Sequence, residues 1–548
     1  MKLHSKLINN RFEYFVLCLF AFTTLLLKEI NYLFYDTLES PDFDKYFIYI
    51  KHFFDNKLTS KEHGLMYYYL NALNFDIFYS DTANTFDMLH KSIQQVNFYI
   101  YVFGLLGYFN LFRFFNFSRI SIYLTFIFIN FFPPSISMRL AFKPEILAFA
   151  LMPWIIYFIE KYIKNKKIKY LVFCIPFLVS AITLKGNILV ILLVYLFFSY
   201  YVIIFKMRLK NFLLIMVLFF STTLMVTLEN NSANGKNILD IQSGSSIESN
   251  YDFKAPLSII YKTDLYELLS SPIKHNHADS FIGITLLETT GDYFDLYWDN
   301  DATNYFKNRI NFIEFRQSNE IKGAEFNSEN FAITIYQQRK TDVYIYESIG
   351  LIISIFLFYL LIKNTVKNKK YRKFLFAAFL GMIVLLFHSI TGIPKNNFDP
   401  LVGDTFKPLY YSFVFIFSFA FLFAILFESK KIKTTYLFVY MFIVIFLLGF
   451  PKEQNYDLQA NMVNRIQDSV YCEIEKRIYL RGSDFENINC RMNREINPNS
   501  ADPNIEFFKN DLNHKPFNLI LIVSYISIAI YSMINKRTIK ISRPKPTV

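Results

Sequence analysis

The sequence predicts an all-α polytopic membrane protein with about twelve transmembrane helices. Composition is the first indication, because 53% of the 548 residues are hydrophobic and only 19% are charged. The second is that the apolar residues form long runs, several of them close to the roughly 20 residues that a spanning helix needs. The third is that lysine and arginine collect in short connections between these runs, as in the cytoplasmic loops of membrane proteins. A soluble chain of this length would instead divide into several domains with polar surfaces.

The apolar runs give the predicted spanning helices. They cover residues 12–34, 97–112, 119–133, 144–160, 169–184, 187–205, 211–228, 347–363, 373–390, 407–427, 434–450 and 517–534. The first run has a basic start and no small-residue cleavage site, so we expect a retained signal anchor.

The basic connections decide the orientation. If every run spans, the amino terminus, the connections 160–169 and 363–373 and the basic carboxyl-terminal tail all fall on one side. Because cytoplasmic loops are enriched in lysine and arginine, we predict that both termini are cytoplasmic. The membrane is then the inner membrane of a bacterium with periplasmic outer loops, or the endoplasmic reticulum membrane with lumenal loops.

The more polar segments fall on the outer face. The predicted units are a transmembrane module (1–228) with the first outer loop (36–96), a large outer loop domain (229–346), the C-terminal helices (347–450), a second large outer loop (451–516) and a last helix with a basic tail (517–548). The first outer loop contains two stretches that look like amphipathic surface segments, FDKYFIYIKHFF and GLMYYYLNAL. Since loops on a rigid scaffold commonly carry function, we look for candidate site residues in these loops.

The net charge of +12 does not indicate nucleic acid. The lysines lie between apolar runs and form no basic stripe on a recognisable nucleic-acid fold. Cys472 and Cys490 share one outer loop and would form either a disulfide or two free thiols, whereas Cys18 and Cys174 lie in apolar runs and are expected only to pack.

Paired acids follow the first apolar run in SPDFDKYF. A carboxylate of Asp42 or Asp44 just outside a membrane could act as a general base toward an acceptor hydroxyl. A D-x-D pair could also hold a divalent cation. The simpler interpretation is that both are solvated acids that cap the helix following them.

Basic residues on the outer face are the second candidate group. In SISMRLAFKPEILAF, Arg139 and Lys143 are four residues apart and would project together from one helix, suited to a phosphate. The alternative is that both reach toward water at the interface. Glu145 follows Pro144 and is predicted to open the next helix, where it could contact substrate. Lys185 lies in a short turn between two apolar runs and would be satisfied by a phosphate, or simply by water.

The stretch LLETTGDYFDLYWDND interleaves acids with aromatic rings. Asp292, Tyr293 and Trp298 are candidate carbohydrate contacts, because aromatic faces stack on sugars and carboxylates accept hydroxyl hydrogen bonds. A small folded loop with solvated acids would give the same pattern. His275 and His277 lack a third ligand at a diagnostic spacing, so no metal site is predicted there. No nucleotide-binding motif is present, which argues against an ATP-driven pump and a cytosolic nucleotide-sugar enzyme.

These features resemble the GT-C superfamily, polytopic glycosyltransferases that use lipid-phosphate-linked sugars. SPDFDKYF is similar to the acidic motif of their first outer loop, with Asp42 at the Asp of P-D-E and Phe43 in place of the Glu, so either Asp42 or Asp44 matches the base. RLAFKPEILAF resembles their second outer loop, which supplies basic contacts to the lipid phosphate, here Arg139 and Lys143. The resemblance covers about the first seven helices.

The resemblance implies a polyprenyl-phosphate monosaccharide donor, a glycan, lipid or protein acceptor, inversion at the anomeric carbon and no cofactor, with a divalent cation left open. Two rivals remain. A polymerase or ligase of lipid-linked glycans would depend on basic residues in later loops. A transporter or flippase would carry charged groups or broken helices at mid-membrane and repeated halves.

Overall fold

The structure is a computed structural model. It describes residues 49–50, 52–54, 65–79, 86–140, 142–182, 184, 191–197, 199–200, 209–231, 263–270, 280–288, 351–352, 354–356, 358–363, 372–374, 376, 383, 409–428, 512 and 515–534. Across these residues the regular elements are all helices, with no strand. The predicted all-α class is therefore confirmed for the described part of the chain.

The described helices are α3 (Met66–Tyr79), α4 (Phe86–Phe114), α5 (Arg119–Phe131), α6 (Pro133–Leu140), α7 (Glu145–Asn165), α8 (Lys169–Ile182), α10 (Leu209–Asn231), α12 (Leu265–Ser270), α13 (Phe281–Glu288), α18 (Leu409–Glu428) and α22 (Pro516–Ile534). Six of the described helices, α5, α7, α8, α10, α18 and α22, match predicted apolar runs to within a few residues. Three segments are long and apolar enough to cross a membrane: Glu145–Asn165, Leu209–Glu229 and Tyr411–Glu428. The predicted total of about twelve is not established, since the runs 12–34 and 434–450 lie outside the described residues.

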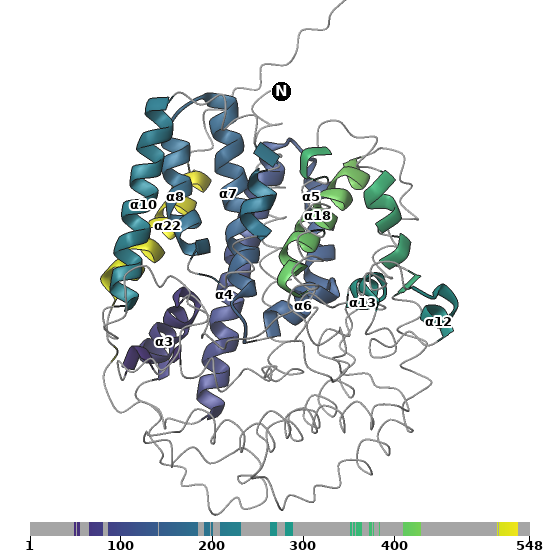
Figure 1. Cartoon of the computed structure of the whole chain (residues 1–548), viewed down its shortest axis with the longest axis horizontal. Helices are drawn as coiled ribbons and strands as arrows, with labels where there is room; N and C mark the ends of the chain where they lie inside the picture. Colours follow the sequence, from purple (N-terminus) through teal and green to yellow (C-terminus); the bar gives the residue numbers. More distant parts are fainter. Residues whose placement is uncertain are drawn as a thin grey trace, which may run out of the picture.

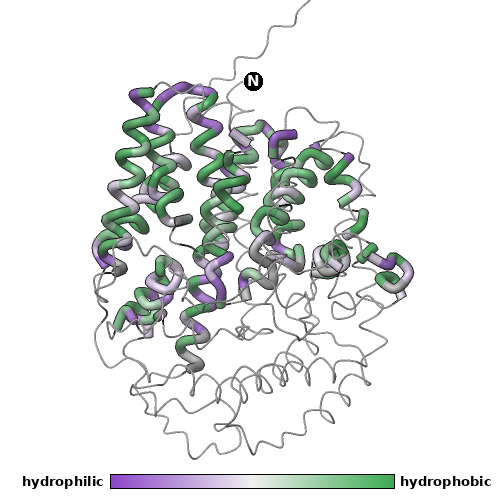
Figure 2. Tube along the Cα trace, in the orientation of Figure 1, coloured by the Kyte–Doolittle hydropathy of each residue, from purple (hydrophilic) through white to green (hydrophobic). Residues whose placement is uncertain are grey.

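The long helices form a bundle with α7 at its centre (Figure 1). Helix α7 packs on α4, α8 and α18, while α10 and α22 contact α8 and α5 contacts α18. Figure 2 shows apolar residues along the middle of the helices and polar residues in the connection between α7 and α8. This distribution is expected when the ends of the helices meet water and their middles do not.

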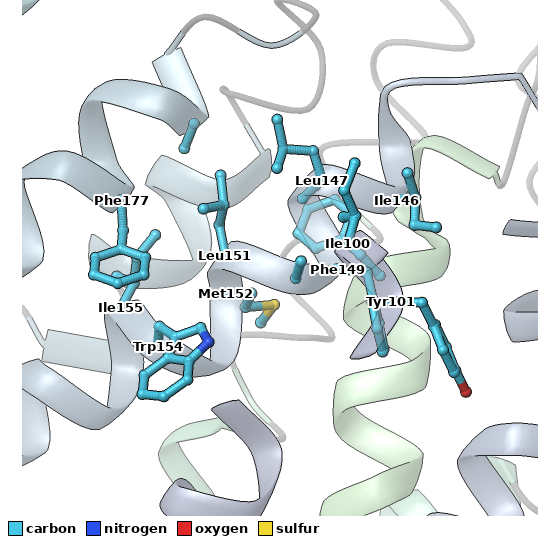
Figure 3. Close-up of a cluster of buried hydrophobic side chains, with 14 of the residues drawn as sticks. Ile100, Tyr101, Ile146, Leu147, Phe149, Leu151, Met152, Trp154, Ile155 and Phe177 are labelled. Carbon is cyan, nitrogen blue, oxygen red and sulfur yellow. The ribbon is translucent and has the colours of Figure 1, made fainter. Parts of the chain in front are cut away.

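Burial separates the central helix from the outer ones. In the most apolar window of α7, 83% of the residues are buried, against 17% in α10. Figure 3 shows α7 side chains from Ile146 to Ile155 packed with Ile100 and Tyr101 of α4 and Phe177 of α8. Helix α10 instead exposes large apolar residues such as Val217 and Phe220. An exposed apolar face of this kind is typical of a surface covered by lipid or by a partner.

Polar contacts join helix ends that the sequence predicts to share one side. On the predicted outer side, the Glu229 carboxylate of α10 accepts hydrogen bonds from the backbone N–H groups of Phe517 and Asn518 at 2.8 and 2.9 Å, which caps α22. On the opposite side, Glu428 at the end of α18 accepts from the backbone N–H of Ser118 at 2.7 Å. These contacts agree with the predicted alternation of the helices across the bundle.

Helix α4 differs from the predicted boundary. The first outer loop was expected to run to residue 96, but α4 begins at Phe86 and has 29 residues. At 1.5 Å per residue it is about 43 Å long, more than the roughly 30 Å hydrocarbon core. The extension carries buried Leu89 and Ile93 beside polar Ser92. Such an amphipathic turn is too polar for a hydropathy window to join it to the apolar run.

The stretches expected to be amphipathic surface segments are instead largely buried where described. In α3, Met66 through Tyr69 are all fully buried, and Tyr49 and Phe53 of the preceding stretch are buried as well. Helix α3 packs on the extension of α4, where the Asn74 side-chain amide donates to the Ser92 hydroxyl at 2.9 Å. The α3 side chains are buried because the helix packs against α4, and that contact cannot be predicted from the sequence of α3 alone.

Candidate functional site

Two consecutive prolines end helix α5 and leave backbone carbonyls near Arg139 without their usual partners. Pro133 and Pro134 have no N–H, so they cannot donate to the carbonyls of Ile129 and Asn130 four residues earlier. Helix α5 therefore ends at Phe131, and the next residue adopts the extended conformation favoured before proline, with φ −70° and ψ 125°. Two carbonyls at the end of α5 are left to be satisfied by side chains.

Arg139 and Tyr101 reach this helix end. The Nη1 atom of Arg139 donates to the Asn130 carbonyl at 2.8 Å. The Tyr101 hydroxyl donates to the Asn130 side-chain oxygen at 2.8 Å and lies 3.4 Å from the Ile129 carbonyl. The guanidinium also stacks over the Tyr101 ring, 4.7 Å from its centre. Arg139 therefore helps to cap α5, and a cation is favourable at a helix carboxyl terminus.

A second layer of hydrogen bonds ties α3 and α4 to the same place. The Tyr67 hydroxyl donates to the Asn97 side-chain oxygen at 2.7 Å, and the Asn97 amide donates to the Arg139 backbone carbonyl at 3.1 Å. Burial raises the pKa of the Tyr67 hydroxyl, and the nearby charge of Glu145 raises it further. Tyr67 is thus a neutral donor. We call Tyr67, Asn97, Arg139, Lys143 and Glu145 the Arg139 cluster.

The predicted helical pairing of Arg139 with Lys143 is wrong. Helix α6 ends at Leu140, and residues 142–144 are not helical, so the two side chains do not project from one helix. The alternative that both reach toward water is also wrong, because Arg139 is 4% exposed and Lys143 is 8% exposed. The reason is Pro144, which disfavours a helical conformation at Lys143 and starts a new helix instead.

Two buried charged groups in the cluster keep unused bonding capacity. The Nε atom of Arg139 has no hydrogen-bond partner among the described residues. The same part of the chain supplies no partner for either carboxylate oxygen of Glu145, which is 1% exposed. A charged group that is buried without a full set of partners destabilises the folded protein by about 3–5 kcal/mol. The cluster could therefore accept an anion at Arg139 and a hydrogen-bond donor at Glu145.

Aromatic rings surround these polar groups. Phe142, between Arg139 and Glu145 in the chain, packs against Tyr67 and Tyr68 with ring centres 5.8 and 6.0 Å apart. Tyr68 also contacts Tyr49, at 4.9 Å. All four rings are buried, so they enclose the polar groups of the Arg139 cluster in an apolar setting.

The remaining candidates fall outside the described residues. These are Asp42, Asp44, Lys185, Asp292, Tyr293, Trp298, Cys472 and Cys490.

The structure bears out two smaller predictions and adds residues that the sequence did not single out. Helix α7 begins at Glu145 behind Pro144, as expected, and Cys174 packs as a buried free thiol. The additions are Tyr67, Asn97 and Tyr101. For Asn97 and Tyr101 the available signal was a polar side chain within an apolar run, since buried polar side chains need partners.

No group of three or more histidine, cysteine, aspartate or glutamate side chains within the described residues is arranged to hold a metal ion. No protein-family model, curated protein or solved structure matches this chain.

Proposed function

We propose that this chain is a multi-pass membrane glycosyltransferase of the GT-C type. It would transfer a sugar from a polyprenyl-phosphate donor to a glycan, lipid or protein acceptor on the outer face of the membrane. The observation that supports it best is Arg139, a buried cation that forms no ion pair within the described part of the chain and keeps its Nε donor unused. A lipid-linked phosphate supplies the missing anion.

Two features support the membrane setting. Three helices are long and apolar enough to cross a bilayer, and α10 exposes apolar side chains along its length. From the basic connections we infer that both termini are cytoplasmic and that the Arg139 cluster lies at the outer ends of the helices, next to the first outer loop. In a bacterium this is the inner membrane, with the acceptor in the periplasm.

The proposed reaction uses the first-loop acids and the cluster together. Asp42 or Asp44 takes the proton of the acceptor hydroxyl, whose oxygen forms a bond to the anomeric carbon of the sugar. The bond from that carbon to the phosphate oxygen breaks, and its electron pair leaves with the polyprenyl phosphate. Arg139 stabilises the leaving phosphate, with Lys143 and Lys185 as further cations. Attack from the face opposite the phosphate inverts the configuration.

The experiment that tests this proposal measures sugar release and transfer by the purified full-length protein. Polyprenyl-phosphate sugars are supplied as a panel, with and without a chelator. We expect turnover of at least one donor, and Asp42→Asn or Asp44→Asn should reduce it by at least about 10²-fold, the usual contribution of a positioned general base.

The control is Asp264→Asn, an exposed acid before α12 whose side chain accepts from the backbone N–H of Tyr266 at 2.8 Å. That variant should turn over donor at the wild-type rate. Turnover that survives both first-loop variants would contradict the mechanism and favour a polymerase or ligase. No turnover of any donor would favour a transporter. Loss of turnover with the chelator would indicate that the acidic pair binds a divalent cation needed for the reaction.

A further inference from the structure

Glu145 differs from the other glutamates at the helix ends. Glu160 lies on the same helix and is also buried, but it pairs with the Lys373 ammonium and accepts from the Tyr200 hydroxyl at 3.0 Å. Glu229 accepts three N–H groups at the start of α22. Both carboxylate oxygens of Glu145 lack a partner within the described residues.

This difference points to a ligand. Where the fold uses a glutamate for structure, it supplies donors, as the partners of buried Glu160 and half-buried Glu229 demonstrate. A carboxylate kept buried without donors destabilises the empty protein. Such local cost is typical of binding sites, where the ligand provides the missing hydrogen bonds.

The neighbourhood of Glu145 defines the chemistry of that ligand. An ionised carboxylate only accepts hydrogen bonds, so its partner must donate them. Arg139, in the same cluster, keeps an unused Nε donor that suits an anion. The Tyr67 ring packs on Phe142 with ring centres 5.8 Å apart, and its hydroxyl is linked through Asn97 to the Arg139 carbonyl. A ligand that carries a phosphate and a ring with an apolar face and hydroxyl groups would match Arg139, the aromatic rings and Glu145.

We propose that Glu145 binds the hydroxyl groups of an uncharged sugar on the lipid-linked donor and excludes sugars that carry a carboxylate. This inference rests on the proposed function and adds the substrate class. A second carboxylate facing Glu145 in a buried site would repel it at short range, whereas sugar hydroxyls donate to both oxygens.

Stability of the ligand-free protein gives the first test. Glu145→Gln removes a buried charge at almost constant volume, so we expect the melting temperature of the full-length protein in detergent to rise by about 2 °C or more. The matched control is Glu160→Gln on the same helix, which breaks an ion pair and should lower the melting temperature. A fall for Glu145→Gln like that of Glu160→Gln would show a structural role and overturn the inference.

Ligand-induced stabilisation gives the second test. The probes are polyprenyl phosphate, a polyprenyl-phosphate hexose and the corresponding polyprenyl-phosphate hexuronic acid. In the wild-type protein the hexose donor should raise the melting temperature more than polyprenyl phosphate, and the hexuronic acid donor should not. In Glu145→Gln the hexose donor should bind about tenfold more weakly, as for one lost hydrogen bond to a charged group, and the preference over the hexuronic acid should disappear.

The two ways of failing can be told apart. If the hexose donor binds but Glu145→Gln keeps the wild-type affinity and preference, this inference is overturned while the proposed function stands. If neither polyprenyl phosphate nor any donor stabilises the wild-type protein, the proposed function fails and the inference fails with it.

Discussion

Arg139→Met is expected to slow sugar release from a polyprenyl-phosphate donor by about 10³-fold, the upper end of the loss when one preorganised contact to a developing charge is removed. Arg139 is 4% exposed, and its guanidinium is held over the Tyr101 ring by its bond to the Asn130 carbonyl, so its orientation is fixed without any ligand. Its Nε donor has no hydrogen-bond partner among the described residues. The measurement is kcat/KM for release of the sugar by purified protein.

The fold should survive this substitution. Methionine loses the hydrogen bond to the Asn130 carbonyl, worth about 1–3 kcal/mol for a charged donor, but it also removes a buried charge. Arg139→Lys keeps the charge and loses the planar fork, so its rate should fall between those of the wild type and Arg139→Met. Arg113→Met is the matched control, since Arg113 stacks 5.5 Å from the Phe109 ring at the opposite end of α4. A wild-type rate in Arg139→Met would contradict a role in phosphate binding.

Gly104→Leu is expected to destabilise the bundle by at least about 3 kcal/mol, at the upper end of the cost of overpacking. A Cβ at this position of α4 would lie 2.7 Å from Cε1 of Phe149 and 2.9 Å from the Cα of Ala150. The second contact is with the backbone of α7, so no side-chain rotation relieves it. Helices α4 and α7 would have to separate, and α7 carries the centre of the core (Figure 3).

Gly107→Ala serves as the comparison for this prediction. Its Cβ would meet only side-chain atoms, 2.9 Å from Cδ1 of Trp154 and 3.0 Å from Cγ of Pro153. We expect a smaller loss, because side chains can shift further than a helix backbone and alanine also favours the helix by about 1 kcal/mol. Thermal unfolding in detergent measures both variants. Equal stability of Gly104→Leu and the wild type would contradict the close approach of α4 to α7.

The sequence by itself determined six of the described helices to within a few residues at each end. The apolar run 169–184 corresponds to Lys169–Ile182, and the run 407–427 corresponds to Leu409–Glu428. Pro144 marks the start of α7 and the pair Pro133–Pro134 follows the end of α5. Both signals are local. A run of apolar residues and the missing N–H of a proline each affect the backbone only within a short stretch of the chain.

Only the tertiary structure decided which polar groups meet. Arg139 and Lys143 do not share a helix, and Arg139 is held by Asn130 of α5 and Tyr101 of α4. Glu160 finds its partner in Lys373, 213 positions further along the chain, while Glu145 on the same helix has none among the described residues. The residues within a few positions of either glutamate do not show which of the two finds a partner. The difference arises from which helices pack around each end of α7, and that packing depends on contacts far apart in the sequence.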